Sequence, residues 1–394
     1  MTAVIDDQQP LTKRRAALEV TGWGRPFTFL QPRNLAMWVY LALVASGTAL
    51  WVQEMQTQSH VYSQAIVASI VVFGLYGALF WWFTARIDRY SSQSAKVKVV
   101  AFIWGGFGAT WAMAAPANDA IRSLYAKAFG QVWALNWSAG LTAPFTEELS
   151  KGLGLLLILA LGRKVVRTAY DGFIIGAFIG LGFQIVEDIS YGMNSAASQF
   201  GANQVGAAMQ TIYMRLAVGV AAHILYSATF CAGLLYLIGT PAQPRRVGRG
   251  LALMATSMLL HGVWDSVSGI VSALGVPGMS FVLLAGVIVL AILIVFWTFH
   301  LTVTPERQYM RDVMAPEVAS GVITQAELDA LSGTRKDRKA YWKSRSGHRD
   351  RKQAKHVLDA SFDLADAIAA DRGLNTPKVE FTRSEVRRLR HATS

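Results

Sequence analysis

The chain has 394 residues, of which 53% are hydrophobic and only 16% are charged. Soluble globular domains usually carry about 25% charged residues, so this composition excludes an ordinary soluble protein and predicts a membrane protein with a polar tail. The net charge of +12 does not indicate a nucleic-acid partner, because many basic residues stand in loops beside apolar runs.

The apolar runs predict an all-α fold, a polytopic bundle of about eight transmembrane helices, since about 20 apolar residues cross the hydrocarbon layer. We expect a cytoplasmic tail over residues 1–33, the membrane domain over 34–300, and a basic cytoplasmic tail, mostly helical or disordered, over 301–394. The predicted spans are 34–55, 63–85, 97–116, 141–162, 169–190, 209–238, 248–272 and 276–300.

The loops between these spans predict the orientation. Lys and Arg occur before the first span and in every second loop after it, whereas loops 56–62 and 191–208 contain neither. Because basic residues stay on the cytoplasmic side, both termini are expected in the cytoplasm, with the chain in the plasma membrane of a prokaryote. The longer 117–140 loop is expected outside, as an amphipathic segment on the membrane surface.

Charged and histidine side chains inside four of the spans are predicted to share one depth, in the outer half of the membrane. Such side chains are costly in a bilayer and usually face a cavity and one another. Asp188 is expected at the interface, with Arg215 reaching outward to it. The residues at the shared depth are Glu147, Glu148, Lys151, Glu187, His223, His261 and Asp265.

Residue spacing supports a shared site. Glu147 and Lys151 are four residues apart, as are His261 and Asp265, so each pair shares a helix face. On the fifth span, glycines recur every fourth residue over 172–180. That ridge permits the close approach of a neighbouring backbone, which would draw the end of this span towards the other polar groups.

Four motifs then indicate a family. "EELSK" at 147–151 fits E-E-x-x-K, "FQIVE" fits F-x-x-x-E, "HGVWD" fits H-x-x-x-D, and "AAHILYSATF" is a further histidine-bearing helix. In this order, the chain resembles the PrsW family of intramembrane proteases over residues 141–270. The related type II CAAX proteases carry E-E-x-x-x-R and F-x-x-x-H, whereas this chain has Gly152 and Glu187 at those places.

The resemblance implies an enzyme that hydrolyses a peptide bond of a membrane-anchored protein near the outer face. Peptide hydrolysis requires a general base and donors for the oxyanion. We predict Glu147 as the base, oriented by Lys151 and assisted by Glu187, with Glu148 supporting the water or the site. His261 and Asp265 are predicted to hold the oxyanion or the peptide.

The same set leaves the cofactor open. A Glu, Glu, His, His set can hold zinc with an open coordination position, although the chain has no HExxH motif. Lys151 disfavours a nearby cation by like-charge repulsion, so a mechanism with glutamate and water is favoured over zinc. The candidate metal ligands are Glu147, Glu187, His223 and His261.

Other functions are open for the same residues. Buried Glu, His and Asp also form proton relays in transporters, which would predict inverted repeats with broken helices. A non-catalytic scaffold would not require the full set of acid, base and donor. The basic tail could bind anionic lipid or a cytoplasmic partner. The expected partners are a membrane-anchored protein substrate and the lipid bilayer, with no nucleic acid.

Overall fold

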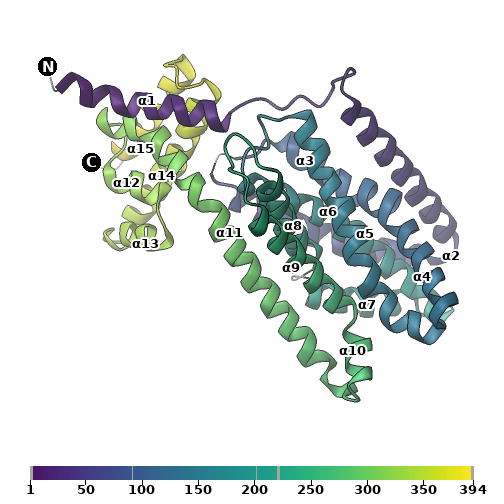
Figure 1. Cartoon of the computed structure of the whole chain (residues 1–394). Helices are drawn as coiled ribbons and strands as arrows, with labels where there is room; N and C mark the ends of the chain where they lie inside the picture. The colour runs from purple at the N-terminus through teal and green to yellow at the C-terminus, as the bar shows by residue number, and fades with distance from the viewer. Residues whose placement is uncertain (1–2, 91, 201, 220–221, 392–394) are drawn as a thin grey trace. The chain divides into compact units, whose positions relative to one another are not determined.

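The computed structural model describes residues 3–90, 92–200, 202–219 and 222–391. Within these ranges the chain is helical and contains no strand, apart from an isolated bridge between Thr240 and Gln243, so the all-α prediction is confirmed. The chain divides into two compact units. Figure 1 labels their helices. The membrane unit comprises Phe27–Ile87 and Gln93–His300, and the tail unit comprises Met1–Pro26, Asp88–Ser92 and Leu301–Ser394.

Long apolar helices make the chain an integral membrane protein. Among the described residues, five stretches are long and apolar enough to cross a membrane. They are α2 (Leu35–Ile87), Ala95–Phe129, α6 (Ala169–Ser195), Gln204–Ile238 and α11 (Ser280–Ala319). Two further helices, α5 (Gln131–Leu161) and α9 (Val247–Asp265), carry charged residues and are less apolar than these five.

Helix α2 covers the first two predicted spans and turns back on itself. Its backbone leaves helical angles at Tyr62, with φ −116° and ψ 31°. The Tyr40 hydroxyl donates to the Val100 carbonyl at 2.8 Å, and the Trp81 ring packs edge-on against Phe102 at 5.7 Å. Tyr40 and Trp81 therefore lie at one level of the unit, although a straight helix would separate them by about 60 Å.

The segment 117–140, predicted as an amphipathic connection between two spans, is helical on both sides of Gly130. This glycine has φ +90°, a conformation that a side chain would strain, and it allows the chain to reverse. Trp133 then packs on Tyr125 and Phe129, with ring centroids 5.5 and 4.5 Å apart. The helices before the reversal are α3 (Ala95–Ile103), the π-helix η1 (Trp104–Ala114) and α4 (Ala115–Phe129).

The single helices predicted over 209–238 and 248–272 are each two helices in the structure. In the first pair, Ala222 has the non-helical angles φ −90° and ψ −142° directly before the second helix, and residues 220 and 221 lie outside the described ranges. In the second pair, Ser266 separates the two helices. The four helices are α7 (Gln204–Gly219), α8 (His223–Ile238), α9 and α10 (Val267–Ala273).

The predicted glycine ridge on α6 is confirmed, and it faces α8. A Cβ atom added at Gly172, Gly176 or Gly180 would lie only 2.7, 2.4 or 2.3 Å from a backbone carbonyl oxygen of α8. The oxygen facing Gly180 belongs to His223. Because these three positions of α6 carry no side chain, the start of α8, with its histidine, can lie directly against α6.

The tail unit is also helical, and its helices begin at clear sequence features. Thr324 and Thr334 each form a capping box with the acidic residue three positions later, Glu327 and Asp337. These boxes satisfy backbone N–H groups that would otherwise lack partners. Besides the end of α11, the helices are α1 (Ala3–Thr21), α12 (Gln325–Ser332), α13 (Arg335–Lys343), α14 (His348–Ala370) and α15 (Pro377–His391).

Candidate active site

Lys151 lies between the two carboxylates of its own helix, α5. Its Nζ atom is 2.9 Å from Glu148 Oε1 and 3.4 Å from Glu147 Oε2. The ammonium also lies 3.9 Å from the centre of the Phe183 ring. All three charged side chains are buried. One cation therefore serves two carboxylates, and α5 alone leaves an excess of negative charge.

His261 of α9 contacts three carboxylates. Its Nδ1 is 3.1 Å from Glu148 Oε1, while its Nε2 is 3.7 Å from Glu147 Oε2 and 3.3 Å from Asp265 Oδ2. The ring stacks on Tyr226, with centroids 5.1 Å apart and planes inclined by 18°. This stacking fixes the plane in which the two nitrogens point.

His223 of α8 approaches Glu147 from the other side. Its Nδ1 is 3.5 Å from Glu147 Oε2 and 3.0 Å from Lys151 Nζ. Its Nε2 is 2.8 Å from Glu187 Oε2 of α6. The structure thus brings together, from four helices, the residues that the sequence places at one depth.

Arg215 of α7 does not reach outward to an exposed interface. Its Nη2 donates to Glu187 Oε2 at 2.8 Å, and its Nε donates to Asp188. The Asp188 side chain is 1% exposed, so it is not in contact with solvent as an interfacial residue would be. The reason is that α7 packs against α6, so that the arginine neutralises two adjacent carboxylates.

Two residues that were not predicted from the sequence also belong to the site. Asn118 of α4 donates from Nδ2 to Glu147 Oε1 at 3.2 Å, and its side-chain oxygen accepts from the Thr146 hydroxyl. Ser227, one turn beyond His223 on α8, donates to Glu148 Oε2 at 3.5 Å. The spacing of Ser227 from His223 is visible in the sequence, whereas Asn118 was hidden by the assignment of its helix to a loop.

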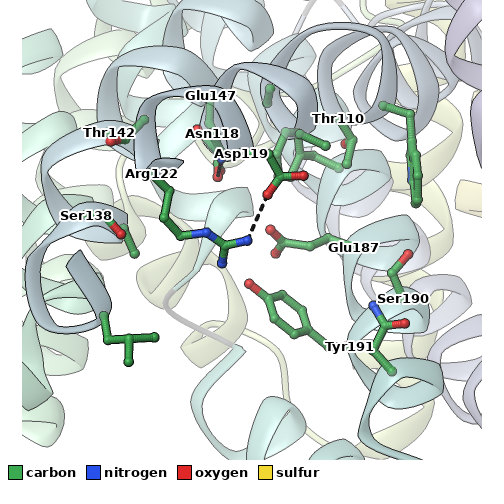
Figure 2. A pocket seen from close by; sticks show the side chains of 17 residues that line it. Thr110, Asn118, Asp119, Arg122, Ser138, Thr142, Glu147, Glu187, Ser190 and Tyr191 are labelled. Atoms are coloured by element: carbon green, nitrogen blue, oxygen red, sulfur yellow. Dashed lines mark hydrogen bonds and ion pairs between the residues drawn. The ribbon is translucent and has the colours of Figure 1, made fainter. Parts of the chain in front are cut away.

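A pocket of about 410 Å³ opens beside Glu147 and Glu187. Figure 2 shows both carboxylates among polar side chains from α4, α5 and α6. The walls come from η1, α4, α5 and α6. Ligand pockets commonly have volumes of about 300–1,000 Å³, so this pocket is large enough for a small ligand beside the two glutamates.

The donor atoms fit a metal ion. One such atom each from Glu147, His223 and His261 lies within 4.8 Å of the other two. Glu147 Oε2 is 3.5 Å from His223 Nδ1 and 3.7 Å from His261 Nε2. A tetrahedral zinc site with bonds of about 2.0–2.2 Å holds its ligand atoms about 3.3–3.6 Å apart, close to both distances.

The surroundings of the histidines bear on the same question. The nitrogen of each imidazole that does not face Glu147 Oε2 contacts another carboxylate, Glu187 for His223 and Glu148 for His261. Metal-binding histidines commonly have such carboxylate partners. Glu187 therefore lies behind His223 rather than at the common point. Lys151 counts against a cation, but its nearest carboxylate is Glu148, which can neutralise it.

Comparison with known proteins gives one family. A family model described as "PrsW family intramembrane metalloprotease" matches residues 93–298, slightly more than half of the 394-residue chain. No significant match was found among curated proteins or among solved structures. The matched range contains every residue of the cluster, and its description favours a metal over the metal-free mechanism that the sequence reading preferred.

Proposed function

Because the chain belongs to the PrsW family of intramembrane metalloproteases, we propose that it hydrolyses a peptide bond of a membrane-anchored protein near the outer face of the membrane. The proposed site is the cluster of carboxylates and histidines on α5, α6, α8 and α9. The observation that carries this proposal is the orientation of His223 and His261, which each present one nitrogen to Glu147 Oε2 and the other to a further carboxylate.

Glu147, His223 and His261 would hold the metal ion, and two nitrogens with one oxygen suit zinc. When bound, the ion polarises the scissile carbonyl and lowers the pKa of the attacking water. The carboxylates of Glu187 and Glu148 would fix the two imidazole rings and their tautomers. Lys151 would neutralise Glu148 and so limit repulsion within the buried cluster.

Glu147 is also the proposed general base, through its other oxygen. Its side chain lines the pocket, and Oε2 faces the histidines and would bind the ion, while Oε1, which accepts from Asn118, would act as the base. This carboxylate would take the proton of the attacking water and return it to the leaving amine nitrogen as the C–N bond breaks. Glu187, which also lines the pocket, would assist this transfer, and Asp265 would accept a hydrogen bond from an N–H group of the peptide.

Cleavage of a co-expressed membrane-anchored substrate tests the function. Glu147→Gln should reduce cleavage by about 10²–10⁴-fold, while the protein accumulates normally. Glu54→Gln is the matched control, because Glu54 is a carboxylate of α2 whose hydrogen-bond partner is Gln58. Full cleavage by the Glu147 variant would show that hydrolysis does not take place at this cluster.

The proposed topology has eight crossings, with both termini in the cytoplasm of a prokaryotic cell. It is supported by the alternation of basic and neutral loops and by the reversal of α2, which would supply two crossings. Helices α5 and α9, with 31 and 19 residues, are long enough to supply two more. A reporter fused after Ser394 should read as cytoplasmic; an external reading would reject this orientation and the outer position of the site.

A further inference from the structure

Two polar groups in the walls of the pocket lack hydrogen-bond partners. They are the Thr142 hydroxyl of α5 and the Trp111 indole N–H of η1. Within the described part of the chain, neither has a partner in the protein, and the Thr142 side chain is 4% exposed. Buried polar groups are almost always paired. Two unpaired groups beside the same pocket therefore indicate that a ligand supplies their partners.

The spacing of hydroxyls on α5 indicates the form of that ligand. Ser138 and Thr142 both line the pocket, as Figure 2 shows, and they are four residues apart on one helix. Four helical residues rise about 6 Å. Two residues of an extended chain rise about 6.6 Å, and backbone groups on one edge of such a chain repeat at that interval. The α5 wall therefore matches the edge of an extended peptide.

The distance from the glutamate sets the register. Thr142 is five positions before Glu147 on α5, which corresponds to about 7.5 Å along the helix axis. An extended peptide covers that distance with about two residues. A substrate whose scissile bond lies at Glu147 would therefore meet Thr142 about two residues away.

The charges in the pocket favour a neutral backbone over an anionic headgroup. Arg122 is the one cation among the described lining residues, and it donates to Asp119 at 3.0 Å. Glu147 and Glu187 would repel a phosphate.

A transmembrane helix has to unwind before its backbone can react, and the bilayer offers no hydrogen-bond partners to the freed groups. Neutral donors on the pocket walls supply them.

We propose that this pocket binds the substrate as an unwound, extended segment, whose backbone carbonyl accepts from the Trp111 N–H and whose next free backbone group pairs with Thr142. Ser138 extends the same edge by one helical turn. This inference rests on the proposed function, since it takes the scissile bond to lie at Glu147.

Binding of fluorescein-labelled casein, an unstructured protein, tests the proposal in detergent micelles. The measurement uses the full chain carrying Glu147→Gln, so that the probe is not cut. Adding Trp111→Phe or Thr142→Val should each weaken binding about three- to tenfold, the loss of one hydrogen bond. Thr142→Ser, which keeps the hydroxyl, should restore it.

The chain offers matched controls. Trp51 and Thr298 also carry buried groups without hydrogen-bond partners, but neither lines this pocket. Trp51→Phe and Thr298→Val should therefore leave binding unchanged. Thr142→Val should keep the thermal unfolding midpoint of the parent, because it replaces a hydroxyl without a protein partner by a methyl group of similar size; a structural role would lower the midpoint.

The outcomes separate the proposal from the function it rests on. On the active background, the pocket variants should raise KM more than they lower kcat. Casein binding that depends on Trp111 and Thr142, in a protein that cuts no membrane-anchored substrate, would count against the proposed function alone. No binding of casein, or equal effects of pocket and control substitutions, would overturn the extended-peptide site.

Discussion

Two buried ionic clusters in this chain are composed in opposite ways. In the tail unit, the single carboxylate of Glu317 lies between Arg14 and Arg383, with a nitrogen of each 2.8 Å from Oε1. Arg383 also donates from Nε to Oε2, at 2.8 Å. The Glu317 side chain is 1% exposed. Every oxygen of this carboxylate is matched by guanidinium donors, as in a structural ion pair.

The cluster of the membrane unit is rich in acid instead. Two cations, Lys151 and Arg215, serve five carboxylates among the described residues, and the two histidines are shared between them. Burial and pairing alone therefore do not distinguish a structural cluster from the proposed catalytic one. Where guanidinium donors pair with both oxygens of a carboxylate, no oxygen is left to bind a ligand. A cluster with more carboxylates than cations retains oxygen atoms that can bind a metal ion, a proton or water. The five carboxylates are Glu147, Glu148, Glu187, Asp188 and Asp265.

Metal removal should give the largest effect and should act on the membrane cluster alone. A chelator should abolish cleavage, and added Zn²⁺ should restore it. The unfolding midpoint should also fall, since a ligand at 100 times its Kd stabilises by about 2.7 kcal/mol. The Glu147→Gln protein should not respond in either respect. Cleavage that persists in protein shown to be metal-free would support the mechanism with glutamate and water.

Glu317→Gln should affect stability rather than catalysis. It leaves Arg14 and Arg383 buried without their carboxylate, and loss of one partner from a buried pair costs about 3–5 kcal/mol. Thermal unfolding in detergent measures the loss, and cleavage per folded molecule should be unchanged. Glu385→Gln is the control, because its pair with Arg388 lies in solvent and its loss should leave the unfolding midpoint unchanged.

Glu187→Gln should have an intermediate effect on catalysis. Removal of a carboxylate behind a metal-binding histidine typically costs about 10–100-fold in activity or metal affinity. Asp188→Asn provides the comparison, because Asp188 pairs with Arg215 and Gln184; its effect on cleavage per folded molecule should stay below tenfold. Equal losses from both variants would mean that Arg215, rather than His223, is the important partner.

The smallest expected effect concerns stability, which the same Glu→Gln substitution should change in opposite directions in the two clusters. In metal-free protein, Glu147→Gln removes one negative charge from an acid-rich cluster, so it should leave stability unchanged or raise it by up to about 2 kcal/mol. Glu317→Gln should lower it. A comparable destabilisation by both substitutions would erase the distinction between the two clusters.

Much of the site was predictable because its signals are local. The four-residue spacings within "EELSK" and "HGVWD" fix which side chains share a helix face. Apolar runs limit the depth at which the charged residues can lie. The glycines of α6 predicted a close helix contact, although not that α8 would make it or that the Gly180 contact would fall on His223.

The sequence by itself determined the helical fold, the family motifs and the membership of most of the cluster, because each depends on the composition or period of one segment. Only the tertiary structure decided that Asn118 reaches Glu147 and that Arg215 binds Glu187 and Asp188. It also decided which nitrogen of each histidine faces Glu147. These features depend on how separate helices rotate and approach when they pack, and no single segment of the sequence encodes that packing.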